Sequence, residues 1–199
     1  MHPMLRVLVL GMCLLLLAGC GVTKPSRFYL LTPTTETGAT TRLEVAIGVG
    51  PVALPEYLDR SEIARRAGDN QIKYAGTHRW AEPLKVSFSR VLSENLATMI
   101  PTEQVVIFPW ARAIPIDYQV TVVVTGYEAD ESGYISLATN WQIIRTDDTT
   151  VIARRMTSYR ETAASTDYAD LVTAQSRALA SLSWDIVKAI RAEISKAGP

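Results

Sequence analysis

Cysteine and histidine are scarce in this sequence, with two of each among 199 residues. Cys13 lies inside an apolar N-terminal run and Cys20 lies directly after it, so the body of the chain has no cysteine pair for a disulfide. His78 is the only histidine after His2. A structural zinc site needs about four nitrogen or sulfur ligands, so such a site is excluded and we expect no bound metal.

The sequence also lacks a charge excess and a recognisable catalytic motif. Lysine and arginine together number 20, as do aspartate and glutamate, so nothing points to nucleic acid as a partner. Neither a G-x-S-x-G elbow nor a phosphate-binding glycine loop occurs. The acidic residues that lie close together fall in predicted turns, where we expect solvated side chains: Glu128, Asp130, Glu131, Asp147 and Asp148. We therefore predict a protein that is not an enzyme and uses no cofactor.

The longest apolar run, Val7–Ala18, contains no charged residue. It is shorter than the ~20 residues that span a bilayer and matches the apolar part of a secretory signal peptide. It leads into Leu17-Ala18-Gly19-Cys20, which resembles the lipobox of bacterial lipoproteins. The resemblance implies that residues 1–19 are removed as a signal peptide and that Cys20 carries a covalent lipid, such as palmitate. The alternative is a buried apolar helix with an incidental thiol.

A lipid on Cys20 would hold the protein on one membrane leaflet. A single acyl chain binds a membrane only weakly, whereas the several chains of a bacterial lipoprotein anchor it stably. Gly21 follows, where an aspartate tends to retain Gram-negative lipoproteins in the inner membrane. The lipoprotein class therefore implies the periplasmic face of the outer membrane. Residues 21–26 reach only roughly 20 Å when extended, so the domain lies close to its membrane. We expect a signal peptide at 1–19, a lipidated N-terminus and short linker at 20–27, and a single periplasmic domain at 28–199.

Apolar periodicity predicts the elements of this domain. Three- and four-residue steps predict an amphipathic helix over 83–100, with a buried face made of Leu84, Phe88, Val91, Leu92, Leu96 and Met99. A longer helix follows a cap at Thr166 or Asp167, with a buried face made of Tyr168, Leu171, Val172, Leu179, Leu182, Ile186, Ile190 and Ile194. Short strands are predicted at 27–31, 43–49, 62–66, 71–75 and 104–108, and three strands over 117–161 predict an antiparallel meander. The expected fold is α+β, a two-layer sandwich of an antiparallel sheet with two amphipathic helices.

Two segments combine apolar or aromatic groups with fixed charges. The first is Gly50–Arg60, whose two prolines we expect to keep it out of regular strand or helix. The second is His78–Leu84, which we also expect to be irregular and which Phe108–Trp110 accompanies. Tryptophan and arginine are enriched at binding hot spots, so both segments are candidates for a docking surface.

The candidate partner-binding residues are Pro51, Leu54, Pro55, Tyr57, Leu58, Arg60, His78, Arg79, Trp80 and Trp110. A structural alternative stays open for the same residues. In that alternative Tyr57 and Trp80 fill the core, and Arg79 pairs with Glu82 or Asp59.

The lipobox, V-G-P-V-x-L-P-x-Y-L-D-R at Val49–Arg60, H-R-W-A-E-P-L at His78–Leu84 and F-P-W at Phe108–Trp110 together resemble the PqiC family. Its members are auxiliary lipoproteins of ABC-type or MCE-type envelope transport systems. The resemblance implies a non-enzymatic, ring-forming homo-oligomer in the outer membrane. Such a protein would receive the end of an MCE-domain tunnel protein of the inner membrane and support phospholipid movement and membrane integrity.

Two other classes of function compete with this transport adaptor. A structural or assembly lipoprotein that supports another outer-membrane machine would carry the same anchor. An envelope hydrolase is the third class, and the lack of a nucleophile–base pair argues against it. Co-purification with an MCE-domain protein separates the first two.

Overall fold

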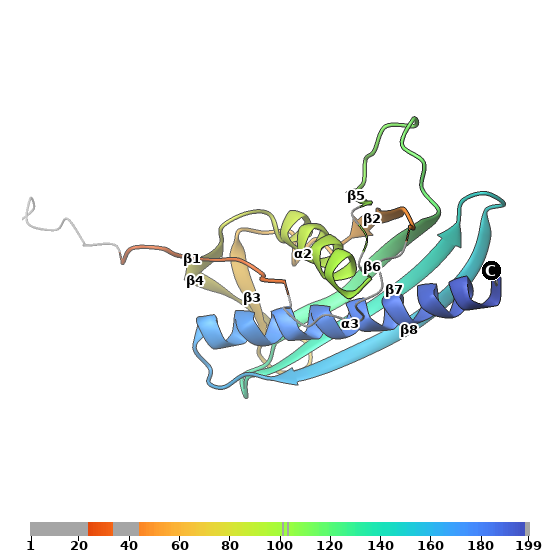
Figure 1. Ribbon diagram of the computed structural model, residues 1–199. Coiled ribbons are helices and arrows are strands. Elements are labelled where there is room, and N and C mark those ends of the chain that lie inside the picture. The colour runs from red at the N-terminus through yellow and green to blue at the C-terminus, as the bar shows by residue number, and fades with distance from the viewer. Residues whose placement is uncertain (1–23, 34–43, 101, 103, 198–199) are drawn as a thin grey trace, which may run out of the picture.

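The computed structural model describes residues 24–33, 44–100, 102 and 104–197 (Figure 1). Its strands and helices follow in chain order as β1 (Arg27–Tyr29), β2 (Ile47–Ala53), β3 (Glu62–Arg66), β4 (Ile72–Trp80), α2 (Leu84–Met99), β5 (Val105–Ile107), β6 (Tyr118–Ala129), β7 (Tyr134–Arg145), β8 (Thr150–Thr162) and α3 (Tyr168–Ala197). The predicted signal peptide, Cys20 and Gly21 lie outside the described residues.

Strand β6 is the centre of one curled eight-stranded sheet. On one edge it pairs with β7 in antiparallel register, and β7 pairs likewise with β8, which confirms the predicted meander. On the other edge it pairs in parallel with β2 and, at Arg65↔Ala129, with β3. Strands β1 and β5 extend the sheet in parallel beside β4 and β2.

The α+β class is confirmed, and one detail of the prediction needs correction, because the sheet is mixed and not wholly antiparallel. Long connections make the parallel pairs feasible, since parallel neighbours need a crossover of a dozen or more residues. Between β2 and β6 the chain forms the β3–β4 hairpin, α2 and β5. Local alternation in the sequence reveals a strand but not the direction of its neighbour.

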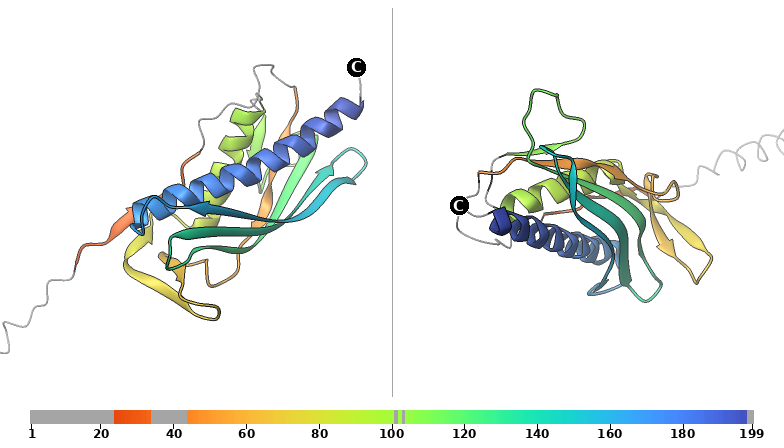
Figure 2. Two further views of the ribbon diagram at one scale, coloured as in Figure 1. Left: turned by 90° about the horizontal axis from the view of Figure 1, so that it is seen from below. Right: turned by 90° about the vertical axis from the view of Figure 1, so that its right-hand side faces the viewer.

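Both helices lie on the same side of the curled sheet (Figure 2). Helix α2 matches the predicted range to within one residue at each end. All six predicted face residues of α2 are at most 1% exposed, which confirms its apolar stripe. Pro83 precedes the helix as its N-cap instead of standing at the first helical position. The two helices touch through Asn95, whose side-chain amide donates to the Ser183 hydroxyl at 3.0 Å.

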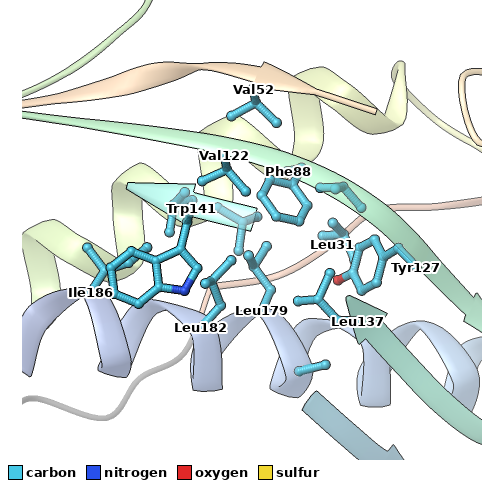
Figure 3. Packing of buried hydrophobic residues seen from close by; sticks show 14 of the residues in the cluster. Leu31, Val52, Phe88, Val122, Tyr127, Leu137, Trp141, Leu179, Leu182 and Ile186 are labelled. Carbon is cyan, nitrogen blue, oxygen red and sulfur yellow. The ribbon is translucent and has the colours of Figure 1, made fainter. Parts of the chain in front are cut away.

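The hydrophobic core lies between the helices and the sheet (Figure 3). Trp141 of β7 packs beside Leu182 and Ile186 of α3, and all three side chains are at most 1% exposed. Phe88 of α2 meets Tyr127 of β6 edge to face, with ring centroids 5.7 Å apart. The predicted buried face of α3 is confirmed, except that its terminal members Tyr168 and Ile194 are only partly buried.

Both segments that were expected to be irregular contribute to strands. Strand β2 runs through Pro51, which lies where the pairing with β6 shifts between Val49 and Val52. A proline fits there because a bulge needs no ladder hydrogen bond from its missing N–H. Strand β4 is longer than predicted and includes His78, Arg79 and Trp80. A tight turn at 67–70 joins β3 to β4, which pair as an antiparallel hairpin.

Candidate functional site

The structure brings part of the first segment against the end of β4. The carbonyl oxygen of Ser61 accepts a hydrogen bond from the backbone N–H of Trp80 at 2.7 Å. Leu58 and Trp80 are only 3% and 5% exposed and belong to the core. The structural alternative placed Tyr57 and Trp80 in the core, and the structure places Trp80 there, whereas Tyr57 is half-buried against the core. Pro51 is exposed on β2, and Leu54 and Pro55 are half-buried.

Tyr57 fixes the irregular segment between β2 and β3 to the sheet. Its hydroxyl donates to Oε2 of Glu128 at 2.9 Å, and the backbone N–H of Tyr127 donates to the same oxygen at 2.7 Å. Arg66 of β3 completes the arrangement, because its Nε donates to Oε1 of Glu128 at 2.9 Å and its Nη2 pairs with the same oxygen. We call these three side chains, Tyr57, Arg66 and Glu128, the Glu128 network.

The electrostatics of the network favour a neutral tyrosine and a charged arginine. Burial raises the pKa of Tyr57 well above its usual range, and the nearby Glu128 carboxylate adds to the effect. Hydrogen bonding to Glu128 raises the pKa of Arg66. The carboxylate is only 4% exposed, and each of its oxygens accepts hydrogen bonds, so its charge is compensated. The network therefore joins the segment after β2 to strands β3 and β6 through hydrogen bonds and an ion pair.

Arg79 pairs with a residue other than those predicted. Its guanidinium lies 3.4 Å from Glu62, whose position is directly opposite on the antiparallel strand β3. Glu82, one of the predicted partners, instead accepts a hydrogen bond from Arg90 at 2.8 Å. The strand register decides this pairing, because facing positions of neighbouring strands lie within reach of each other.

Arg60 adds a second cation beside Glu62. Its Nε lies 3.9 Å from the Glu62 carboxylate, and its guanidinium stacks over the Tyr74 ring at 4.7 Å from the centroid. The pKa of Glu62 is lowered, chiefly because the Glu62 carboxylate accepts a hydrogen bond from the backbone N–H of Glu62. Ser61 and Arg79 make smaller contributions in the same direction. The side chain of Arg60 stays 54% exposed, so it is presented to solvent.

An open cleft of about 270 Å³ lies beside these charges. Its walls come from the two segments that the sequence singled out, and its lining residues are Asp59, Arg60, Ser61, Trp80, Ala81, Glu82 and Pro83. We call this feature the charged cleft. It offers carboxylates, one guanidinium and the edge of a buried indole, which suits recognition of a partner through ion pairs and apolar contact.

His78 has a structural setting away from the cleft. Its Nδ1 shares a hydrogen bond with the Tyr29 hydroxyl at 2.7 Å, which ties β4 to β1. Its ring stacks on Tyr168 with centroids 4.0 Å apart, and Arg65 lies over the same Tyr168 ring at 5.7 Å. These contacts join the edge of the sheet to the start of α3. His78 is therefore a half-buried residue with a structural role in packing.

Trp110 also lies apart from the charged cleft. It packs over Gly48 of β2 so closely that a Cβ there would lie 2.7 Å from the indole ring. Phe108 covers Gly50 in the same manner and meets Trp110 edge to face at 5.5 Å. The F-P-W motif thus covers glycines of β2, and the structure does not unite it with His78–Leu84.

Sequence reasoning missed the residues that hold the site together. Glu128 was expected in a solvated turn, and this was wrong, because it lies in β6 and is buried under Tyr57. Its partners Tyr57 and Arg66 are 71 and 62 residues away, so no local pattern could have revealed them. Among the described residues, no three acidic, cysteine or histidine side chains gather where they could hold a metal ion.

The fold is that of a class of small α+β proteins with solved structures. One is an uncharacterized protein with a TM-score of 0.70 and 20% identity, matched over 84% of this chain and 99% of its own. Another is a DUF330 protein from Xanthomonas campestris with a TM-score of 0.71 and 17% identity, matched over 86% and 99%. At these identities the likeness concerns the fold. No curated protein matches the sequence.

The family is shown by the sequence itself. The model of the ABC-type transport auxiliary lipoprotein component family matches residues 29–187, which is most of the chain. This protein belongs to that family, and the resemblance to PqiC-type auxiliary lipoproteins is confirmed. It is therefore an auxiliary component of ABC-type transport and a member of a lipoprotein family. No helix in the part of the chain that the structure describes combines the length and apolarity needed to cross a bilayer.

Proposed function

We propose that this protein is a non-enzymatic outer-membrane lipoprotein that docks an inner-membrane-anchored MCE-domain tunnel protein and supports phospholipid transport between the membranes. Cys20 holds it by covalent lipid on the periplasmic face, as the lipobox predicts. The family membership supports the transport role, since the matched family serves ABC-type systems. Contact with a partner, and not a reaction, is its contribution.

The observation that carries the proposal is the charged cleft. Two segments far apart in the sequence, 59–61 and 80–83, build it together. The Glu128 network fixes the approach to the first segment through Tyr57, and Glu62 holds Arg79 beside Arg60. A preorganised surface loses less entropy on binding than a mobile one, which favours a docking role.

The lipid anchor also favours assembly into a ring. Subunits confined to one leaflet have a high effective concentration, so weak lateral contacts suffice to associate them. A ring of such subunits would present several copies of the charged cleft to a tunnel protein. Homo-oligomerisation is thus part of the proposal, and native mass spectrometry of the detergent-purified lipoprotein measures it.

A charge reversal in the cleft tests the docking role. Full-length Arg60→Glu lipoprotein is expressed in its host, the envelopes are solubilised in detergent, and co-purified proteins are identified. Arg154→Glu is the matched control, because Arg154 is equally an exposed arginine and its side chain contacts Gln142 on the β7–β8 face. We expect wild type and Arg154→Glu to retain an MCE-domain protein. Arg60→Glu should bind that protein at least about tenfold more weakly, which corresponds to ~1.4 kcal/mol of binding free energy.

The same experiment separates the competing class of function. Equal retention by Arg60→Glu would show that the charged cleft is not the docking surface. Consistent capture of another outer-membrane assembly, with no MCE-domain protein, would favour the structural or assembly lipoprotein. Melting curves of both variants establish that any loss is not due to unfolding.

A further inference from the structure

Two large apolar side chains stand exposed on β1 and directly after it. Phe28 is 63% exposed and Leu30 is 46% exposed. Alternation along an extended segment places them opposite Tyr29 and Leu31, which pack against or within the core. Among the strands that the structure describes, β1 pairs with β4 alone and forms one edge of the sheet.

Basic side chains accompany this apolar pair. Lys24 and Arg27 are both exposed and lie within four residues of Phe28. Aromatic and aliphatic groups next to lysine or arginine suit the boundary between headgroups and acyl chains, where the cations meet anionic lipid.

The position of Cys20 in the chain supplies the third observation. Cys20 precedes Phe28 by eight residues, which span at most about 28 Å even when fully extended. Strand β1 lies at the opposite end of the domain from the C-terminus of α3 (Figures 1 and 2). An anchor at Cys20 therefore brings the β1 end of the domain to the membrane, and not the end at which α3 finishes.

We propose that Lys24, Arg27, Phe28 and Leu30 form a second membrane contact that inserts into the surface of an anionic phospholipid bilayer. The proposal rests on the lipid anchor of the proposed function and adds a defined orientation to it. Phe28 and Leu30 enter the headgroup boundary, while Lys24 and Arg27 meet lipid phosphates. The domain is then held with β1 against the bilayer and the C-terminus of α3 away from it.

An environment-sensitive fluorophore at position 28 tests the contact. Once Cys20 carries lipid and residues 1–19 are removed, an introduced cysteine is the only thiol. Full-length lipidated Phe28→Cys is labelled and reconstituted into vesicles of phosphatidylethanolamine and phosphatidylglycerol. Met156→Cys is the control, because Met156 is 83% exposed on β8. We expect a blue-shifted emission at position 28, quenched by lipid-tethered nitroxide, and a water-like emission at position 156.

Each remaining outcome is informative. Water-like emission at position 28 in protein that floats with the vesicles would overturn the contact and leave the anchor intact. A blue shift at position 28 that the lipid-tethered nitroxide does not quench would assign the patch to a second copy or a protein partner, which also overturns it. Failure of both labelled proteins to float overturns the anchor and the contact together. Adding Lys24→Glu and Arg27→Glu should reduce the shift at least twofold on anionic vesicles and leave flotation unchanged.

Discussion

The Tyr57 hydroxyl donates a hydrogen bond of 2.9 Å to the Glu128 carboxylate, across 71 residues of sequence. This contact ties the segment after β2 to the end of β6, and through Arg66 to β3. The charged cleft begins two residues after Tyr57, so this part-buried hydrogen bond helps to fix the position of its first wall.

Replacing Tyr57 by phenylalanine should destabilise the fold measurably. The ring would still pack, but Glu128 would lose one hydrogen bond while staying buried, which costs ~1.5–3 kcal/mol for a charged acceptor. Denaturant unfolding of the full chain measures this change. Tyr134→Phe is the control, because Tyr134 is 52% exposed, and it should stay within about 0.5 kcal/mol of wild type. Equal effects of both changes would contradict a role for the network.

Stability should fall at high pH through tyrosines whose pKa is raised in the folded protein, and half-buried Tyr159 is one of them. Burial raises the pKa of Tyr159 to about 12, and its hydroxyl donates to Asp185 at 2.8 Å. A raised folded-state pKa gives stability that is complete below the unfolded value of about 10 and is lost as the pH rises toward 12.

Melting temperatures of wild type and Tyr159→Phe between pH 8 and about 12 test this prediction. The variant should melt lower at pH 8, where it lacks the hydrogen bond to Asp185. The gap should narrow at the alkaline end, because only the wild type has this hydroxyl to ionise. A gap that does not change with pH would show that Tyr159 does not titrate on unfolding.

Truncation of Leu182 should be among the more costly changes in the core. Leu182 of α3 is fully buried beside Trp141 and Ile186, so Leu182→Ala removes contacts and leaves a cavity. We expect a loss of ~2–5 kcal/mol in the free energy of unfolding. Val123→Ala, at a position 48% exposed on β6, is the control and should cost far less. A loss below about 0.5 kcal/mol for Leu182→Ala would contradict the packing.

Replacement of Cys20 should abolish membrane attachment. Cys20→Ala removes the acylated thiol of the lipobox, so we expect an unprocessed precursor without lipid. Labelling with a radioactive fatty acid and density-gradient fractionation measure the result, with Cys13→Ala as the control that should still be lipidated. Recovery of the wild type as a soluble periplasmic protein would contradict the anchor.

Local periodicity was enough to predict the regular elements. The stripe from Leu84 to Met99 predicted α2, and alternation after residue 117 predicted the three strands of the meander. These patterns are reliable because each element buries one face, and its own sequence must show which face that is. The family motifs likewise lie in the sequence, and they pointed to the two segments that form the charged cleft.

The sequence by itself therefore determined the helices, the meander, the α+β class and the family. Tertiary structure decided the parallel pairing of β2 with β6, the partner of Arg79 and the burial of Glu128. It also separated Trp110 from the cleft and placed Trp80 in the core. The physical reason is distance along the chain: strand direction, register and a carboxylate's partners depend on segments 17 to 71 residues away, and local spacing carries no information about them.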